Sequence, residues 1–165
     1  MPTTNTRSAT GPTSPNEAAP AEAFAVSTDQ GEQLSFGGAT MVLLASAAST
    51  AGAFTLFEEL PPLLDTSRHV HAHEDEMYYV LEGEHDFDCG DQTMRVGPRG
   101  VVFLPRGVPH AHRRVRPGVG RLLGMTSPAG FEGFFRILAE AASSGTLSAD
   151  AYYRASDAHG IRWLD

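Results

Sequence analysis

Three histidines and three carboxylates stand together in the segment HVHAHEDE, residues 69–76. Imidazole nitrogen and carboxylate oxygen in combination suit divalent Fe, Mn, Ni, Cu or Zn better than Ca or Mg. In a strand, side chains two residues apart point to the same face, so a histidine pair at this spacing can bind one metal ion. Two pairs qualify, His69 with His71 and His71 with His73, and the spacing alone does not choose between them.

A carboxylate and a distant histidine are available to complete such a site. If strand alternation continues beyond the histidines, Glu76 and Tyr78 share one face of the next strand and can meet the histidine pair across an antiparallel neighbour. Two histidines and one carboxylate leave open positions on a metal ion. The later segment HAH places His110 and His112 on one strand face. A ligand from such a remote strand is what closes a site inside a barrel.

Short strands are the elements that must position these residues. Apolar or alternating runs are interrupted by Gly, Pro and Asp, which is typical of an antiparallel sandwich or barrel. The segments CGDQ and RPGVGR are typical of hairpin turns between consecutive strands. The predicted strands cover residues 40–46, 53–60, 76–83, 85–90, 92–97, 101–105, 110–115 and 121–127.

The pattern changes after Pro128. Apolar residues at three- and four-residue spacing predict an amphipathic helix over 130–145. A second helix is predicted over 147–160, with Ser148 as its N-cap and Gly160 as its stop. An aromatic stripe of this kind is more typical of packing against a barrel or a second subunit than of a ligand pocket.

The segment HVHAHEDEMYYVLEG resembles the first motif of the cupin superfamily, H-x-H-(x)3–4-E-(x)6-G. With His69 and His71 as the pair, four residues precede Glu76 and six more precede Gly83, which is a full match. With His71 and His73 as the pair, only two residues precede the glutamate, and the match fails. The resemblance therefore selects His69 and His71 as the pair and assigns no motif position to His73.

The segment LPRGVPH resembles the second cupin motif, G-(x)5-P-x-G-(x)2-H-(x)3-N, through Pro105, Gly107 and His110. The sequence departs from that motif at both ends, with Arg99 in place of the first glycine and Arg114 in place of the asparagine. Neither position is a metal ligand in the family. The departures concern the entrance turn and a hydrogen bond at a strand end.

The resemblance is to small single-domain cupins of the quercetin-dioxygenase-like group. It implies an all-β fold, the double-stranded β-helix or jelly-roll barrel, here followed by C-terminal α-helices, and usually a homodimer. It also implies one divalent transition metal per chain. Three neutral imidazoles and one carboxylate leave residual positive charge that attracts an enolate or catecholate oxygen. The implied ligands are His69, His71, Glu76 and His110.

The expected function is that of a metal-dependent dioxygenase acting on dioxygen and a small enolic or phenolic substrate. Glu76 or His112 is expected to take the proton of the substrate, and Tyr78 to line the cavity. A satisfied histidine at the barrel mouth is the alternative interpretation of His112. Two other functions stay open: a redox-neutral lyase, isomerase, decarboxylase or cyclase, and a non-catalytic binder of small molecules.

Neighbouring side chains are expected to be structural. We expect surface positions for His73, as a turn residue or a donor beside the site, and for His85, Glu74 and Asp75. We expect core positions for Phe87, Phe103 and Cys89.

The length of 165 residues suits one folded domain. We expect a disordered leader over 1–23, rich in Pro, Thr, Ser and Ala, a barrel over 24–127 and a helical extension over 128–165, packed on the barrel or on a dimer partner.

The charge and the apolar runs limit the partners. A net charge of −8 argues against nucleic acid and anionic membranes. No apolar run approaches the roughly 18 residues that span a bilayer. Cys89 is the single cysteine, so an intrachain disulfide is excluded. These features predict a cytoplasmic protein.

Overall fold

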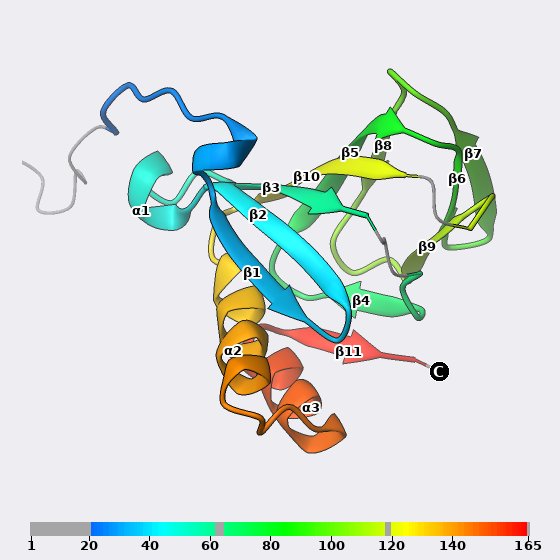
Figure 1. Ribbon diagram of the computed structural model, residues 1–165. Helices are drawn as coiled ribbons and strands as arrows, with labels where there is room; N and C mark the ends of the chain where they lie inside the picture. The colour runs from blue at the N-terminus through cyan, green and yellow to red at the C-terminus, as the bar shows by residue number, and fades with distance from the viewer. Residues whose placement is uncertain (1–20, 62–64, 118–119, 165) are drawn as a thin grey trace, which may run out of the picture.

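The computed structural model describes residues 21–61, 65–117 and 120–164, and shows two sheets with helices gathered at one end (Figure 1). Most of the predicted leader over 1–23 lies outside these residues. The strands are β1 (Glu32–Phe36), β2 (Ala39–Ala45), β3 (Thr55–Leu60), β4 (His69–His71), β5 (Asp75–Glu82), β6 (His85–Cys89), β7 (Gln92–Val96), β8 (Val101–Leu104), β9 (His110–Arg114), β10 (Arg121–Ser127) and β11 (Ile161–Trp163). The helices are the 3-10 helix η1 (Thr28–Gln30), α1 (Ala47–Thr50), α2 (Glu132–Ser143) and α3 (Ala149–Ala158).

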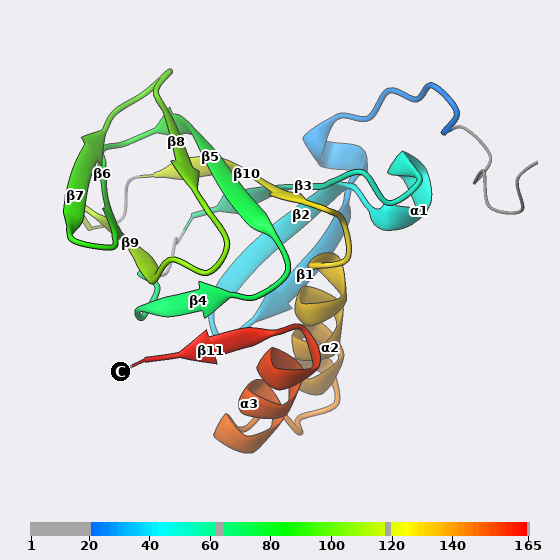
Figure 2. The same cartoon turned by 180° about the vertical axis from the view of Figure 1, so that it is seen from behind.

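The strands form two facing antiparallel sheets (Figure 2). One sheet has six strands in the order β1-β2-β3-β10-β5-β8, and the other has five in the order β11-β4-β9-β6-β7. Strands that follow one another in the chain often lie in different sheets, as β3 and β4, β4 and β5, and β9 and β10 do. This is the arrangement of a double-stranded β-helix, and it confirms the predicted fold class.

The two predicted hairpin turns have different outcomes. Cys89 pairs with Gln92 across a tight turn between β6 and β7, so the first hairpin is confirmed. The second prediction, for RPGVGR, is wrong because β9 and β10 belong to different sheets and the segment between them crosses from one to the other. A local turn signal cannot distinguish a hairpin from such a crossing, because both require the same residues.

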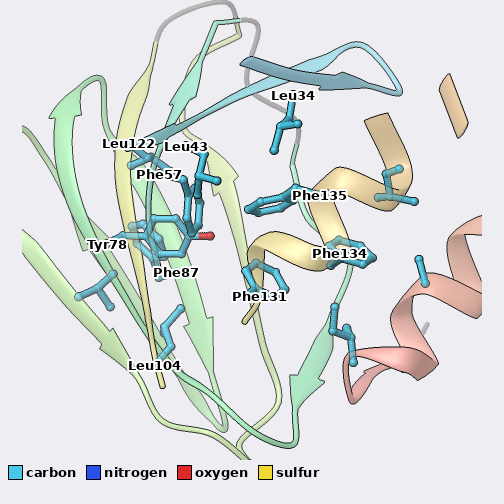
Figure 3. Packing of buried hydrophobic residues seen from close by; sticks show 14 of the residues in the cluster. Leu34, Leu43, Phe57, Tyr78, Phe87, Leu104, Leu122, Phe131, Phe134 and Phe135 are labelled. Carbon is cyan, nitrogen blue, oxygen red and sulfur yellow. The ribbon is translucent and has the colours of Figure 1, made fainter. Parts of the chain in front are cut away.

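The interior of the barrel is filled by aromatic side chains (Figure 3). Phe57 and Phe87 are fully buried, and the ring of Tyr78 meets that of Phe57 edge to face with centroids 6.3 Å apart. Gly124 lies opposite Phe57 in the register of β10 and β3, and a Cβ atom there would overlap the phenyl ring. This glycine therefore makes room for the largest side chain of the core.

The C-terminal helices pack against the barrel as the sequence predicts. α2 buries Phe131, Phe134 and Phe135, and the last of these stacks on Phe36 of β1 at 5.9 Å. The hydroxyl of Ser148 accepts a hydrogen bond from the first turn of α3, which confirms it as the N-cap. The chain then forms β11, which pairs with β4 and was not predicted because three residues show no periodicity.

Several predictions of exposure are wrong. His85 is fully buried, and Glu74 is buried as well. Phe103 is 57% exposed because β8 is an edge strand and this residue points away from the second sheet. The remaining expectations hold: Phe87 is core, Cys89 packs at the edge of the core, His73 is exposed and Asp75 is half-exposed.

None of the helices in the described part of the chain is long and apolar enough to cross a membrane.

Candidate metal centre

Four side chains from three strands converge inside the barrel. β4 places His69 and His71 on one face, β5 contributes Glu76, and β9 contributes His110, which lies opposite His69 in the register of the two strands. All four residues are buried, and one possible ligand atom from each lies within 4.8 Å of all the others. The structure thus brings together the four residues that the sequence predicts as ligands.

Backbone carbonyls orient two of the imidazoles. The Nδ1 atom of His69 lies 2.9 Å from the carbonyl oxygen of Ser67, and that of His110 lies 2.9 Å from the carbonyl oxygen of Val108. Because a carbonyl oxygen only accepts hydrogen bonds, each Nδ1 carries the hydrogen. The Nε2 atom of each ring is then left with a free lone pair, which is the form that binds a metal ion.

The third imidazole is oriented by a side chain. The Nδ1 atom of His71 lies 3.4 Å from the carboxylate of Glu74, which explains why this glutamate is buried beside the turn. Burial by itself would lower the pKa of His71, but the hydrogen bond with Glu74 and the negative charges of Glu76 and Glu74 raise it above its ordinary value. A histidine paired with a carboxylate in this way is a common arrangement around bound metals.

The donor atoms at the centre fit a divalent cation. Among the described residues, the buried Nε2 atoms of His71 and His110 have no hydrogen-bond partner. A buried polar atom without a partner costs about 1–3 kcal/mol, and a cation at the centre of the cluster would remove that cost. The cluster is therefore compatible with a metal site.

The electrostatics of the cluster agree with this fit. Burial would raise the pKa of the Glu76 carboxyl, but the imidazole of His110, whose Nε2 atom lies 3.3 Å away, and the other two imidazoles lower it to about 2. Burial lowers the pKa of His69 to about 4, so this imidazole is neutral near pH 7. An ionised carboxylate and a neutral imidazole are the protonation states that bind metal.

The cluster opens into a cavity of about 310 Å³ with two unlike walls. On the barrel side, we call five polar side chains the polar wall: Glu59, His69, His71, Glu76 and Tyr78. This side is also lined by Phe36, Ala39, Met41, Asp65, Thr66 and Ser67. We call the side formed by the C-terminal extension the aromatic wall; it consists of Phe131, Phe134, Phe135, Tyr152, Tyr153 and Trp163.

The aromatic wall lies directly against the cluster. The ring of Trp163 is 4.7 Å from that of His69, and the ring of Phe131 is 4.8 Å from that of His71. The indole N–H of Trp163 donates to the hydroxyl of Ser156 at 2.8 Å, which holds the orientation of the ring. The sequence favours a packing role for the aromatic stripe, and the structure adds that its inner edge also lines the cavity.

Glu59 of β3 is a second buried carboxyl in the polar wall, and the sequence did not predict it. The hydroxyl of Tyr78 lies 3.2 Å from the Oε1 atom of Glu59 and 3.0 Å from the Oε1 atom of Glu76, so it bridges the two carboxyl groups. Burial and the negative charge of Glu76 raise the pKa of Glu59 to about 8. The only signal for it in the sequence is a pair of acidic residues inside the apolar strand AFTLFEEL.

His112 is buried but lies apart from the cavity wall. Its ring packs 5.3 Å from that of Tyr78 and 5.8 Å from that of Phe87, and the described residues that line the cavity do not include it. Burial lowers its pKa to about 4, so the ring is neutral near pH 7. Its Nε2 atom is 3.9 Å from the carboxyl of Glu59, beyond direct hydrogen-bond distance.

The two departures from the second motif lie away from the cluster. Arg99 adopts φ of 71°, a left-handed conformation that glycine adopts without strain. Arg114 donates from its backbone N–H and its guanidinium to the carboxylate of Asp65, at 3.0 and 3.1 Å. Its side chain thus forms a different contact at this strand end.

Both the sequence and the fold resemble those of known proteins. Residues 56–124 match the model of the cupin domain family. This match and the double-stranded β-helix support placing the chain in the cupin superfamily. A search among curated proteins found no match.

Solved structures with the same fold include enzymes. KdgF from Halomonas is 13% identical over 67% of this chain and 98% of its own, with a TM-score of 0.57. A Klebsiella pneumoniae protein with a double-stranded β-helix domain is 16% identical over 66% and 93%, with a TM-score of 0.52. Pac13 from Streptomyces, described as a nucleoside dehydratase, is 12% identical over 67% and 87%, with a TM-score of 0.53.

Identities this low show the fold alone. The quercetin-dioxygenase-like group, the homodimer and the cytoplasmic location therefore stay predictions.

Proposed function

We propose that this protein is a metal-dependent enzyme that holds one divalent transition metal ion and acts on a small organic molecule in the cavity. The observation that carries this proposal is the buried cluster, in which one possible ligand atom from each of three histidines and one glutamate converge, and three of these residues line the cavity. The existence of enzymes among proteins of the same fold supports it. The ligands would be His69, His71, Glu76 and His110.

A divalent metal at this position would supply a Lewis acid, and a redox-active one would also support chemistry with dioxygen. The residues of the chain perform the other tasks. The aromatic wall excludes water and binds the apolar body of a substrate, while the polar wall directs an oxygen atom of the substrate toward the cluster.

A dioxygenase reaction on an enolic or phenolic substrate is our leading proposal for the reaction. The three-histidine, one-carboxylate set leaves open positions for such chemistry, and the cavity of about 310 Å³ is at the lower end of the range for small-molecule sites. Oxygen consumption with flavonol-like or 1,3-dicarbonyl compounds measures it. If the Fe-, Mn-, Ni- and Cu-loaded forms of the protein consume no oxygen with these compounds, the result would count against a dioxygenase reaction.

A redox-neutral reaction is the second candidate, and Glu59 favours it. This buried carboxyl lines the cavity without belonging to the cluster, so it is free to exchange a proton with a substrate. Pac13 shows that the fold also carries dehydration chemistry in another protein. Turnover that is undiminished under anaerobic conditions would favour this candidate over a dioxygenase.

Metal analysis of two histidine variants tests the proposed site. We expect about one metal ion per chain in the wild type, and an affinity lower by on the order of 100-fold or more in His69→Ala. The matched control is His73→Ala, which removes an exposed histidine from the same segment and should bind like the wild type. Equal metal binding by both variants, or none by the wild type, would overturn the proposal.

A further inference from the structure

A substrate with an acidic hydroxyl must lose a proton in the cavity, and the polar wall limits where that proton can go. Glu76 has little capacity left, because its Oε2 atom faces His110 at 3.3 Å and its Oε1 atom accepts the hydroxyl of Tyr78 at 3.0 Å. His112 is buried behind the wall and does not line the cavity. Two carboxyls line the cavity outside the cluster, Glu59 and Asp65. Asp65 pairs with Arg114 at 3.1 Å, whereas Glu59 contacts the hydroxyl of Tyr78.

The surroundings of Glu59 leave its carboxylate without a strong cationic partner. The adjacent Glu58 is paired with Arg121 at 2.7 Å, whereas the ion pairs of the described residues give Glu59 only His112, at 3.9 Å. In the register of the sheet, Glu59 lies between Met41 of β2 and Leu122 of β10. A buried carboxylate in such surroundings binds a proton readily.

The hydrogen bonds among Glu59, Tyr78 and Glu76 also accommodate a proton bound to Glu59. The hydroxyl of Tyr78 has one hydrogen but lies between the two carboxyl groups. When Glu59 is protonated, it can donate to the oxygen of Tyr78 while Tyr78 donates to Glu76, so that each bond contains one hydrogen. When Glu59 is ionised, the same hydroxyl faces two carboxylates and can satisfy only one of them.

We propose that Glu59 is the proton acceptor of the site, and that the site takes small molecules with an acidic hydroxyl, such as enols and phenols. This inference rests on the proposed function, which places the hydroxyl of the substrate beside the cluster. The O–H bond of the substrate breaks, its electron pair stays on the oxygen, and the proton moves to the carboxylate of Glu59, which becomes neutral. This assigns to Glu59 the role that sequence reasoning gave to Glu76 or His112.

The groups around Glu59 give it a basicity suited to this task. Its pKa is raised to about 8 by burial and by the charge of Glu76, while the hydrogen bond from Tyr78 opposes the rise. His112 is neutral near pH 7 and adds no charge. A base with a pKa near the working pH is the most effective one.

Proton release on ligand binding tests the assignment without any measurement of turnover. The probe is maltol, a small enol with one ionisable hydroxyl, titrated calorimetrically into the zinc-loaded protein in buffers of different ionisation enthalpy. Where Glu59 is ionised before binding and neutral in the complex, the wild type should release fewer protons than Glu59→Gln, which cannot accept one. At pH 6 Glu59 is already protonated, and the two proteins should release equal numbers.

Asp65→Asn is the matched control, because Asp65 is another carboxylate that lines the cavity. Burial would raise its pKa, but Arg114 lowers it overall, so this residue is a weak acceptor and its variant should release protons like the wild type. Equal release by wild type and Glu59→Gln between pH 6 and 9 would overturn the inference. So would an Asp65→Asn variant that behaves like Glu59→Gln.

A second measurement keeps this test separate from that of the proposed function. Carbon-13 labelling of the glutamate carboxyls should show one resonance in the zinc-loaded protein that titrates well above the ordinary range and is missing from Glu59→Gln. A Glu59 carboxyl that titrates in the ordinary range of about 4 to 5 would overturn the inference even if maltol does not bind. Failure to bind zinc would instead overturn the proposed function.

Discussion

The polar wall and the aromatic wall of the cavity come from different parts of the chain. All members of the polar wall lie within the cupin domain match over 56–124, whereas all members of the aromatic wall lie after residue 130. The first wall contains groups that ionise or offer lone pairs, and the second contains rings. If the proposed function holds, metal binding and recognition of the organic ligand depend on separate segments, and mutation can alter them one at a time.

Weakening a support of the polar wall should have the largest of three effects. We expect Glu74→Gln to lower metal affinity by about 10-fold or more, because it removes the charge that orients and polarises His71. Affinity for an organic ligand that binds the aromatic wall should fall only in proportion to the fraction of protein that has lost its metal. Competition with a metal chelator measures the first quantity.

The control for that variant is Asp75→Asn. Asp75 is the next carboxylate in the chain, but it pairs with Arg106 near the surface, 2.8 Å away, and does not contact the cluster. Metal affinity in this variant should match the wild type. If both variants lose the same affinity, the comparison fails, because general charge rather than the contact to His71 would be responsible.

Altering the aromatic wall should have an intermediate effect of the opposite kind. We expect Trp163→Leu to weaken binding of catechol about 5- to 10-fold, since an aromatic contact is worth about 0.5–1.5 kcal/mol, while metal affinity stays at the wild-type value. Acetohydroxamate, which has no ring, should bind both proteins alike. Equal losses for the two ligands, or loss of metal, would show that the walls do not act separately.

A change at the entrance turn should have the smallest effect and leave both walls intact. We expect Arg99→Gly to stabilise the fold by about 1 kcal/mol, because glycine adopts the left-handed conformation without steric cost. Thermal unfolding measures it, and the melting temperature should rise by a few degrees. A lower melting temperature would mean that contacts of the arginine side chain outweigh the backbone strain.

The sequence identified the four candidate ligands because their signal is local. Two histidines at strand spacing, a glutamate at a set distance and a later histidine all follow from short-range patterns, and β4, β5 and β9 place them as expected. Glu59 could not be found in this way. Its strand lies two places from β5, with β10 between them, and only the strand order of the folded sheet brings it to Tyr78.

Burial was harder to predict than strand position. Glu74 stands in a polar run that predicts a solvated turn, and it is buried because His71 offers it a hydrogen bond. His85 begins β6 after a turn, where exposure is the usual outcome, yet it is fully buried, and its Nε2 atom lies 3.2 Å from the carbonyl oxygen of Glu82. In both positions a partner from the folded structure outweighs the preference of the local sequence.

The short strand β11 has a consequence for how the protein is made. β4, which carries two of the four candidate ligands, pairs with β9 at a single position and with β11 at three. A chain leaves the ribosome from its N-terminus, so β4 emerges long before the strand that holds most of its edge. We therefore expect the four candidate ligands to reach their final arrangement late in synthesis, after Ile161–Trp163 has emerged.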